Sequence, residues 1–178
     1  MLKKIGIALL MVVLLLVVVI ATRPAHFRIE RSAQINAPSA VVFPLINDFH
    51  NWPKWSPWEK LDPDMKKTYR GAPAGTGAEY AWVGNDKAGE GRMTITDSKP
   101  TDLVSIKLEF LKPFAATNQA TFKLTPAGDG TQVQWIMEGD NGFMAKGFGL
   151  VVNMDSLVGK DFEQGLSSLK QLAQSEVK

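Results

Sequence analysis

The side chains that most often carry catalysis or bind metals are scarce in this sequence. It contains two histidines, His26 and His50, and no cysteine. Neither histidine has the spacing to a second histidine or to a carboxylate that a zinc site of the H-E-x-x-H kind requires. The lack of cysteine excludes a thiol nucleophile, thiolate metal ligands and disulfide bonds. We therefore expect no metal site and no cofactor.

Nucleotide chemistry and nucleic-acid binding also lack their usual sequence features. The glycine-rich stretches 71–77 and 139–149 do not end in the Lys-Ser/Thr pair of a phosphate-binding loop, and no G-x-S-x-G nucleophile motif occurs. The chain has 20 Lys and Arg against 18 Asp and Glu, so the two signs balance once Lys3 and Lys4 are set aside. Like charges are not grouped, whereas nucleic-acid-binding surfaces are strongly basic. We expect no nucleic acid partner.

Three polar residues remain as candidates for chemistry. Tyr80 and Asn118 lie on otherwise apolar faces of expected strands, where a polar group can orient a ligand inside an apolar cavity. Hydrogen bonds to the backbone or to water would satisfy the same groups without any ligand. If the chain is an enzyme, Tyr80, Asn118 or Asp97 is the group that would transfer a proton. Each of these roles requires a cavity, which other elements of the fold must enclose.

Alternation of apolar and polar residues predicts a sheet of antiparallel strands. The expected strands are 27–36, 66–71, 77–84, 90–98, 102–111, 115–125 and 131–139. The sequence Ala127-Gly128-Asp129-Gly130 gives the strongest hairpin signal between them. In the last three strands the apolar side chains share one face and the polar ones the other, which is typical of a sheet with one solvated side. Such an apolar face needs a cover.

Two helical patterns can supply that cover. A short helix begins at Pro38, which we place at its first position, and Pro44 limits its length. The long helix, 154–175, turns an apolar face toward the sheet that consists of Leu157, Val158, Phe162, Leu166, Leu169 and Ala173. Its Gly159 and Gly165 each cost up to ~1 kcal/mol relative to alanine. These glycines allow either close packing against a neighbouring backbone or room for a guest molecule.

Two irregular segments each have more than one interpretation. The loop 52–58 carries Trp52, Trp55 and Trp58, and it is structural, the rim of a pocket or an interfacial contact. The segment 142–152 places large apolar side chains among glycines just before the long helix. It is either a movable flap over a cavity or a short amphipathic helix that completes the core.

The N-terminal apolar run bears on the location of the protein. Residues 5–21 carry no charge and are followed by Thr22, Arg23 and Pro24. As a helix with ~1.5 Å rise per residue the run is about 26 Å long, close to the ~30 Å hydrocarbon core of a bilayer. A signal peptide cleaved after Ala21 is the alternative, but the run exceeds the ~7–15 apolar residues usual for one. We expect an uncleaved single-pass anchor.

Basic residues indicate how this anchor is oriented. Lys3, Lys4 and the amino terminus lie close to one end of the apolar run, against Arg23 and Arg28 at the other. We expect the N-terminus in the cytoplasm and, in a bacterium, the domain on the periplasmic or outer face of the inner (cytoplasmic) membrane. The expected organisation is a cytoplasmic head at 1–4, a transmembrane anchor at 5–22, a linker at 23–26 and one ligand-binding domain at 27–174.

The order of elements and several short motifs are similar to a known family. The motifs are Ile35-Asn36-Ala37-Pro38, Val42-Phe43 in a helix that ends at Asp48, Trp55-Ser56-Pro57-Trp58 and Phe162-Glu163-Gln164-Gly165-Leu166-Ser167-Ser168-Leu169-Lys170. With them, residues 27–174 resemble the polyketide cyclase/dehydrase-like branch of the START/Bet v 1 (SRPBCC) superfamily. The resemblance implies an α+β fold of the helix-grip type, a curved antiparallel sheet gripping a long C-terminal helix, here preceded by one transmembrane helix. Because the family has no invariant catalytic set, it assigns no catalytic residue.

The resemblance also implies a deep apolar cavity between sheet and helix. Our first hypothesis is a membrane-tethered module, not an enzyme, that binds a hydrophobic small molecule or lipid; its oligomeric state stays open. The expected ligand-binding residues are Tyr80, Trp82, Met93, Ile106, Leu108, Asn118, Phe122, Trp135, Met137, Phe143, Phe148, Phe162 and Leu166. The alternatives are a polyketide cyclase/dehydratase-like enzyme and an interaction protein with no internal ligand. An internal void smaller than ~300 Å³ would favour the last of these.

Overall fold

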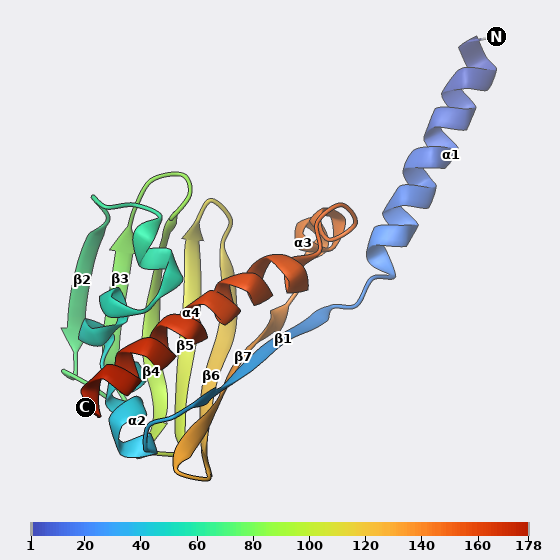
Figure 1. Cartoon of the computed structure of the whole chain (residues 1–178). Coiled ribbons are helices and arrows are strands. Elements are labelled where there is room, and N and C mark those ends of the chain that lie inside the picture. The colour runs from blue at the N-terminus through green and yellow to red at the C-terminus, as the bar shows by residue number, and fades with distance from the viewer. Residues whose placement is uncertain (1, 178) are drawn as a thin grey trace.

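The computed structural model describes residues 2–177 as a separate N-terminal helix followed by a curved sheet and a long C-terminal helix (Figure 1). The elements are α1 (Leu2–Ala21), β1 (His26–Ile35), α2 (Ser39–Asn47), η1 (Phe49–Lys54), η2 (Pro57–Lys60), β2 (Lys66–Gly71), β3 (Ala78–Val83), β4 (Glu90–Lys99), β5 (Leu103–Lys112), β6 (Ala116–Ala127), β7 (Gly130–Asp140), α3 (Phe143–Phe148) and α4 (Met154–Glu176). The α+β helix-grip fold is therefore confirmed.

The seven strands form one antiparallel sheet in the order β1-β7-β6-β5-β4-β3-β2. Every expected strand is present, with ends within two residues of the expected ones. The chain crosses from β1, at one edge, to β2 at the other through α2 and the two 3-10 turns η1 and η2. Register shifts near Ile95 in β4 mark an irregularity of the kind that bends a strand, and α4 lies across the concave face (Figure 1).

The helix α4 packs on the sheet with one face. Its buried residues are Gly159, Phe162, Gly165, Leu166, Leu169 and Ala173. The inward orientation expected for Leu157 is wrong, because 54% of its surface is exposed. Leu157 precedes Leu166 by nine residues, and at 3.6 residues per turn this spacing places the two side chains on opposite sides of the helix.

The tryptophan loop is structural. Its Trp52 and Trp55 are buried and donate indole hydrogen bonds of 2.9 Å to the carbonyl oxygens of Ile46 and Leu45 at the end of α2. The start expected for α2 needs a correction, since Pro38 is its N-cap, in extended conformation, and the helix begins at Ser39. These bonds tie the loop to α2 beneath the concave face of the sheet.

A stack of aromatic rings fills the middle of the space between sheet and α4. The rings of Trp135 on β7 and Phe162 on α4 are parallel within 5°, with centroids 4.1 Å apart. Phe122 on β6 packs against Trp135 at 4.7 Å, and the edge of Trp58 approaches it at 5.5 Å. This part of the interior is solid.

The two glycines of α4 make room for side chains of the chain itself. A Cβ added at Gly165 would lie 2.8 Å from Cζ3 of Trp135 and 3.1 Å from Cδ of Pro57. A Cβ added at Gly159 would overlap the guanidinium group of Arg31 on β1. The atoms closest to the two glycines therefore belong to side chains of the sheet and of the tryptophan loop. The glycines make room for these side chains, and not for a neighbouring backbone or a guest molecule.

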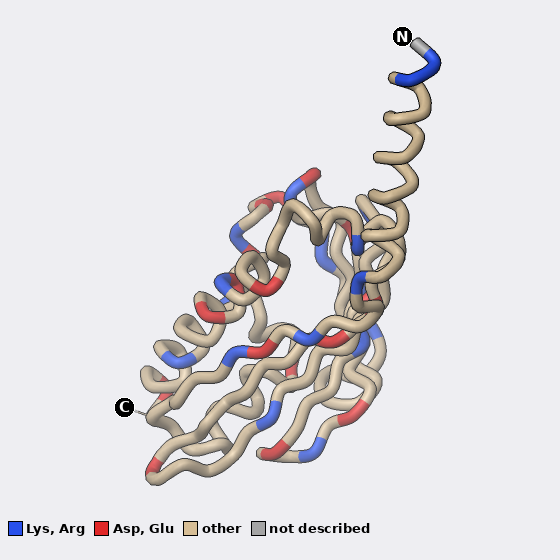
Figure 2. Tube along the Cα trace, turned by 90° about the vertical axis from the view of Figure 1, so that its right-hand side faces the viewer, with Lys and Arg blue, Asp and Glu red and all other residues tan. Residues whose placement is uncertain are grey.

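The helix α1 projects away from the domain and contacts α3 only near its last turn (Figure 1). Within residues 2–177 it is the one helix that is long and apolar enough to cross a membrane. Its apolar side chains are exposed up to Val19, and after its two N-terminal lysines it carries no charge, whereas charges of both signs cover the domain (Figure 2). A short linker, residues 22–25, joins it to β1.

Replacing Gly165 with alanine tests the role of this close approach. Gly165→Ala should lower the free energy of unfolding by about 1–3 kcal/mol, since the rigid indole of Trp135 must move to admit the methyl group. Gly142→Ala is the matched control, because no atom lies within 4 Å of the added Cβ there. Thermal or urea denaturation of both variants gives the comparison, and equal stability would contradict the packing described.

Candidate functional site

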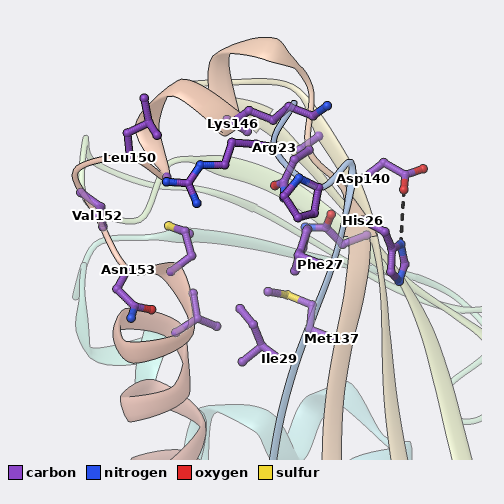
Figure 3. A pocket seen from close by; sticks show the side chains of 18 of the residues that line it. Arg23, His26, Phe27, Ile29, Met137, Asp140, Lys146, Leu150, Val152 and Asn153 are labelled. Atoms are coloured by element: carbon purple, nitrogen blue, oxygen red, sulfur yellow. Dashed lines mark hydrogen bonds and ion pairs between the residues drawn. The ribbon is translucent and has the colours of Figure 1, made fainter. Parts of the chain in front are cut away.

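A cavity of about 740 Å³ lies beside this solid core, at the end of the sheet nearest to α1. It is open to one side and is bordered by the linker before β1, the first residues of β1, the last residues of β7, the facing ends of β5 and β6, the segment from α3 to α4 and the N-terminal half of α4 (Figure 3). The lining residues are Arg23, Pro24, His26, Phe27, Ile29, Phe110, Ala116, Asn118, Met137, Asp140, Asn141, Ala145, Lys146, Gly149, Leu150, Val151, Val152, Asn153, Met154 and Val158.

The inner wall of the cavity is apolar. Phe27 and Ile29 alternate along β1 and point into the cavity together with Met137, the cross-strand partner of Ile29 on β7 (Figure 3). Gly139, the partner of Phe27, leaves space that Phe27 and Asn118 occupy, because a Cβ added there would overlap Oδ1 of Asn118 and lie 2.9 Å from Phe27. Asn118 thus contributes a polar group to an otherwise apolar wall.

The mouth of the cavity is polar. His26 and its cross-strand partner Asp140 border the cavity, with Nδ1 of His26 3.3 Å from Oδ1 of Asp140, but both side chains are largely exposed and point away from it, because His26 alternates along β1 with the inward-facing Phe27 (Figure 3). The Arg23 side chain extends from the linker across the cavity toward the segment that carries Leu150 and Val152 (Figure 3). A molecule in the cavity would therefore have apolar contacts inside and the guanidinium group of Arg23 at the opening (Figure 3).

The segment from α3 to the start of α4 forms the outer wall. It does not complete the core, as one interpretation expected, because no residue of α3 is buried. Ala145, Lys146 and Gly149 face the cavity, and Asn153 caps α4 by accepting a 3.0 Å hydrogen bond from the backbone N–H of Ser156. No buried apolar side chain of α3 therefore fixes this wall to the core.

Arg31 holds this wall on the sheet. Its Nε donates to Glu163 at 2.8 Å, and its two terminal nitrogens donate to the carboxylate of Asp155 at 3.1 Å. Nη2 also donates to the backbone carbonyl of Asp155 at 3.1 Å. The hydrogen bonds from Arg31 lower the pKa of Asp155 below its ordinary value. This cluster ties the first turns of α4 to β1 where Gly159 leaves room for the guanidinium.

Two of the thirteen expected ligand-binding residues line the cavity, Asn118 and Met137. The others that are buried lie in the core outside it: Tyr80, Trp82, Met93, Ile106, Phe122, Trp135, Phe162 and Leu166. Leu108 is partly buried against that core, and Phe143 and Phe148 on α3 are half-exposed. Sequence reasoning missed Phe27 and Ile29 as walls, although their alternation with polar residues in β1 is visible.

Sequence reasoning also missed the pair formed by His26 and Asp140 at the border of the cavity. His26 and Asp140 are 114 residues apart, and only the register of β1 on β7 brings them together. The other histidine lies outside the cavity, where His50 bonds to Asp48 at 2.8 Å and stacks on Tyr69. Within residues 2–177 no group of three or more His, Asp or Glu side chains is placed to hold a metal ion.

The groups expected to transfer a proton are dispersed. Tyr80 lies outside the cavity and donates to Oε1 of Glu59 at 2.8 Å. Burial and the neighbouring carboxylate raise the pKa of Tyr80 well above its ordinary value, which keeps the phenol protonated. Asp97 is exposed on β4, so of the three groups only Asn118 lines the cavity, and an amide does not titrate.

A curved antiparallel sheet that grips a C-terminal helix beside an internal cavity defines the Bet v 1-like class of folds. Solved structures of this class are similar to the chain at low identity. Protein MLL2253 from Mesorhizobium loti is 18% identical with a TM-score of 0.59, over 84% of this chain and 98% of that one. Ara h 8.0201 is 14% identical with a TM-score of 0.58, over 84% of this chain and 99% of that one.

DynU16, a putative protein in the dynemicin biosynthetic locus, is 14% identical with a TM-score of 0.59, over 84% of this chain and 48% of that one. The sequence profile of the polyketide cyclase/dehydrase and lipid transport family matches residues 26–174, and the chain belongs to this family. No curated protein sequence matches the chain significantly. Family and fold together describe a module of the kind that binds hydrophobic molecules.

Removing Arg31 should loosen the outer wall of the cavity. In Arg31→Met we expect amide hydrogen exchange in residues 150–160 to rise about tenfold, since the wall loses its charge-assisted hydrogen bonds. Residues 166–173 should keep their protection, because Leu166, Leu169 and Ala173 stay buried. Arg92→Met, which breaks a 2.7 Å pair with Glu109 away from the cavity, is the control. Equal exchange in the two variants would contradict this role of Arg31.

Proposed function

We propose that the protein is a membrane-tethered module that binds a hydrophobic small molecule or lipid in the cavity between α4 and the ends of β1 and β7. The observation that carries the proposal is the cavity itself, with about 740 Å³ of space, an apolar inner wall and a polar mouth. Ligand pockets in proteins have volumes of about 300–1,000 Å³ and are mostly apolar with a few placed polar groups. An interaction protein without an internal ligand does not need this space.

The cavity favours a ligand with one apolar and one polar end. The apolar end would contact Phe27, Ile29 and Met137, and the polar end would lie at the mouth near Arg23 (Figure 3). The stack of Trp135 on Phe162 limits how far the ligand can enter. The binding residues that we propose are therefore those that line the cavity, of which Asn118 and Met137 were expected from the sequence.

The tether would be α1. Its apolar run is long enough to span, and the linker of residues 22–25 keeps the cavity next to the point where α1 enters the domain. A lipid ligand is concentrated in the bilayer, so a short tether raises the chance of capture. The basic residues Lys3 and Lys4 favour an N-terminus in the cytoplasm and a domain on the opposite face of the membrane.

A tryptophan that fills the cavity tests the proposed site. The full-length protein in mild detergent should bind an environment-sensitive lipophilic dye, and a lipid extract should displace it. Val158→Trp should weaken dye binding at least about tenfold, since the indole occupies the space that the ligand needs. Leu157→Trp is the matched control, because Leu157, the residue before Val158, is exposed and does not line the cavity.

Native mass spectrometry of the delipidated protein, re-exposed to the same extract, identifies what binds. A bound lipid or small molecule in the wild type and in Leu157→Trp, but not in Val158→Trp, would support the proposal. Equal dye binding by the two tryptophan variants, or no ligand in the wild type, would contradict it. Circular dichroism shows that each variant is folded.

The anchor has its own test. Protein isolated from membranes should retain residues 1–21 and resist extraction by alkaline carbonate, since a span of about twenty apolar residues inserts stably. Intact-mass measurement shows whether the segment is present. A mature protein that begins at Thr22 and washes off the membrane would remove the tether and leave the cavity proposal in place.

A further inference from the structure

We propose that an apolar rim formed by Phe114, Phe143, Met144, Phe148 and Val151 is a second membrane contact, which docks the mouth of the cavity onto the bilayer that holds α1. This inference rests on α1 being the anchor, as proposed above. In this arrangement the domain lies against the lipid surface. A ligand then passes between the bilayer and the cavity without crossing water.

The side chains of the apolar rim are unusually exposed. The exposed fraction is 82% for Val151, 77% for Met144 and 76% for Phe114. Phe148 and Phe143 are 54% and 50% exposed. Single exposed apolar residues are ordinary, whereas several large ones around one opening indicate a surface that meets another apolar phase.

The position of α3 identifies that phase. α3 contacts α1, and a Cβ added at Gly147 would lie 3.5 Å from Cδ1 of Ile20. Nζ of Lys146 is 3.5 Å from the carbonyl oxygen of Ala21. Ile20 belongs to the apolar run of α1, so α3 lies at the depth where that run ends, beside its last turn (Figure 1). In a membrane this depth is the interface between hydrocarbon and headgroups.

Of the apolar rim, Val151 lines the cavity itself, and the rim residues of α3 lie beside the lining residues Ala145, Lys146 and Gly149. Phe114 lies in the loop between β5 and β6, and the strand residues Phe110 and Ala116 that flank this loop line the cavity. The basic residues Arg23 and Lys146 also line the cavity, and both lie near the last residue of α1, where the headgroup phosphates of an enclosing bilayer would be. Apolar side chains with basic groups beside them are the composition of segments that bind at a lipid interface.

Site-specific fluorescence in lipid measures this contact directly. Because the chain has no cysteine, one environment-sensitive probe can be attached through Met144→Cys or Val151→Cys in the full-length protein. The protein is reconstituted in phosphatidylcholine/phosphatidylglycerol nanodiscs, with and without lipids that carry a nitroxide quencher on the acyl chain. Val12→Cys in the middle of α1 reports insertion of the anchor. Asp129→Cys, in the exposed hairpin at the opposite end of the sheet, reports water.

The proposal predicts that the probes at positions 144 and 151 lose most of their fluorescence to the quencher, as the probe at 12 does, while the probe at 129 loses none. Quenching at 12 but not at 144 and 151 would overturn the docked rim and leave the anchor standing. No quenching at 12 would remove the anchor and the rim with it. A blue shift at 144 that depends on the protein-to-lipid ratio and not on the quencher would assign the rim to a second copy of the chain.

Discussion

The stack of Trp135 on Phe162 is the contact on which the rest of the structure depends. It joins β7 to the middle of α4 at a ring separation of 4.1 Å, and Gly165 permits this approach because any Cβ there would meet the indole. Large aromatic side chains dominate the burial of apolar surface in a core, and here they close the inner half of the space under α4. The same contact that fixes the helix therefore leaves open space only in the outer half, where the cavity lies.

The outer half is built from weaker contacts. No side chain of α3 is buried, and the first turns of α4 are tied to β1 by the polar cluster of Arg31 with Asp155 and Glu163. Elements with few buried apolar contacts open at low cost in free energy, and ligand-binding segments commonly come from this class. The molecule thus has a rigid half that maintains the fold and a looser half that adjoins α1.

The sequence predicts the fold well because the fold follows from periodicity. Alternation along each strand tells which side chains point inward, and the helical spacing of Phe162, Leu166 and Leu169 predicts the covering helix. Periodicity cannot tell whether two inward side chains meet or leave a space between them. Trp135 and Phe162 were both expected to line a pocket, and in the structure their rings stack on each other beside the cavity. The pair of His26 and Asp140 is invisible for a similar reason, since strand register brings it together.

Methyl NMR of the full-length protein in detergent, titrated with the lipid extract, shows whether a ligand enters the cavity beside the aromatic stack. The account predicts chemical-shift changes at methyl groups that line the cavity, in particular Ile29, Met137 and Val158, with the core methyls of Ile106, Leu166 and Leu169 unchanged. Changes that centre on the core methyls, or no changes at all, would contradict it, because a ligand would then displace the aromatic stack or would not enter the protein.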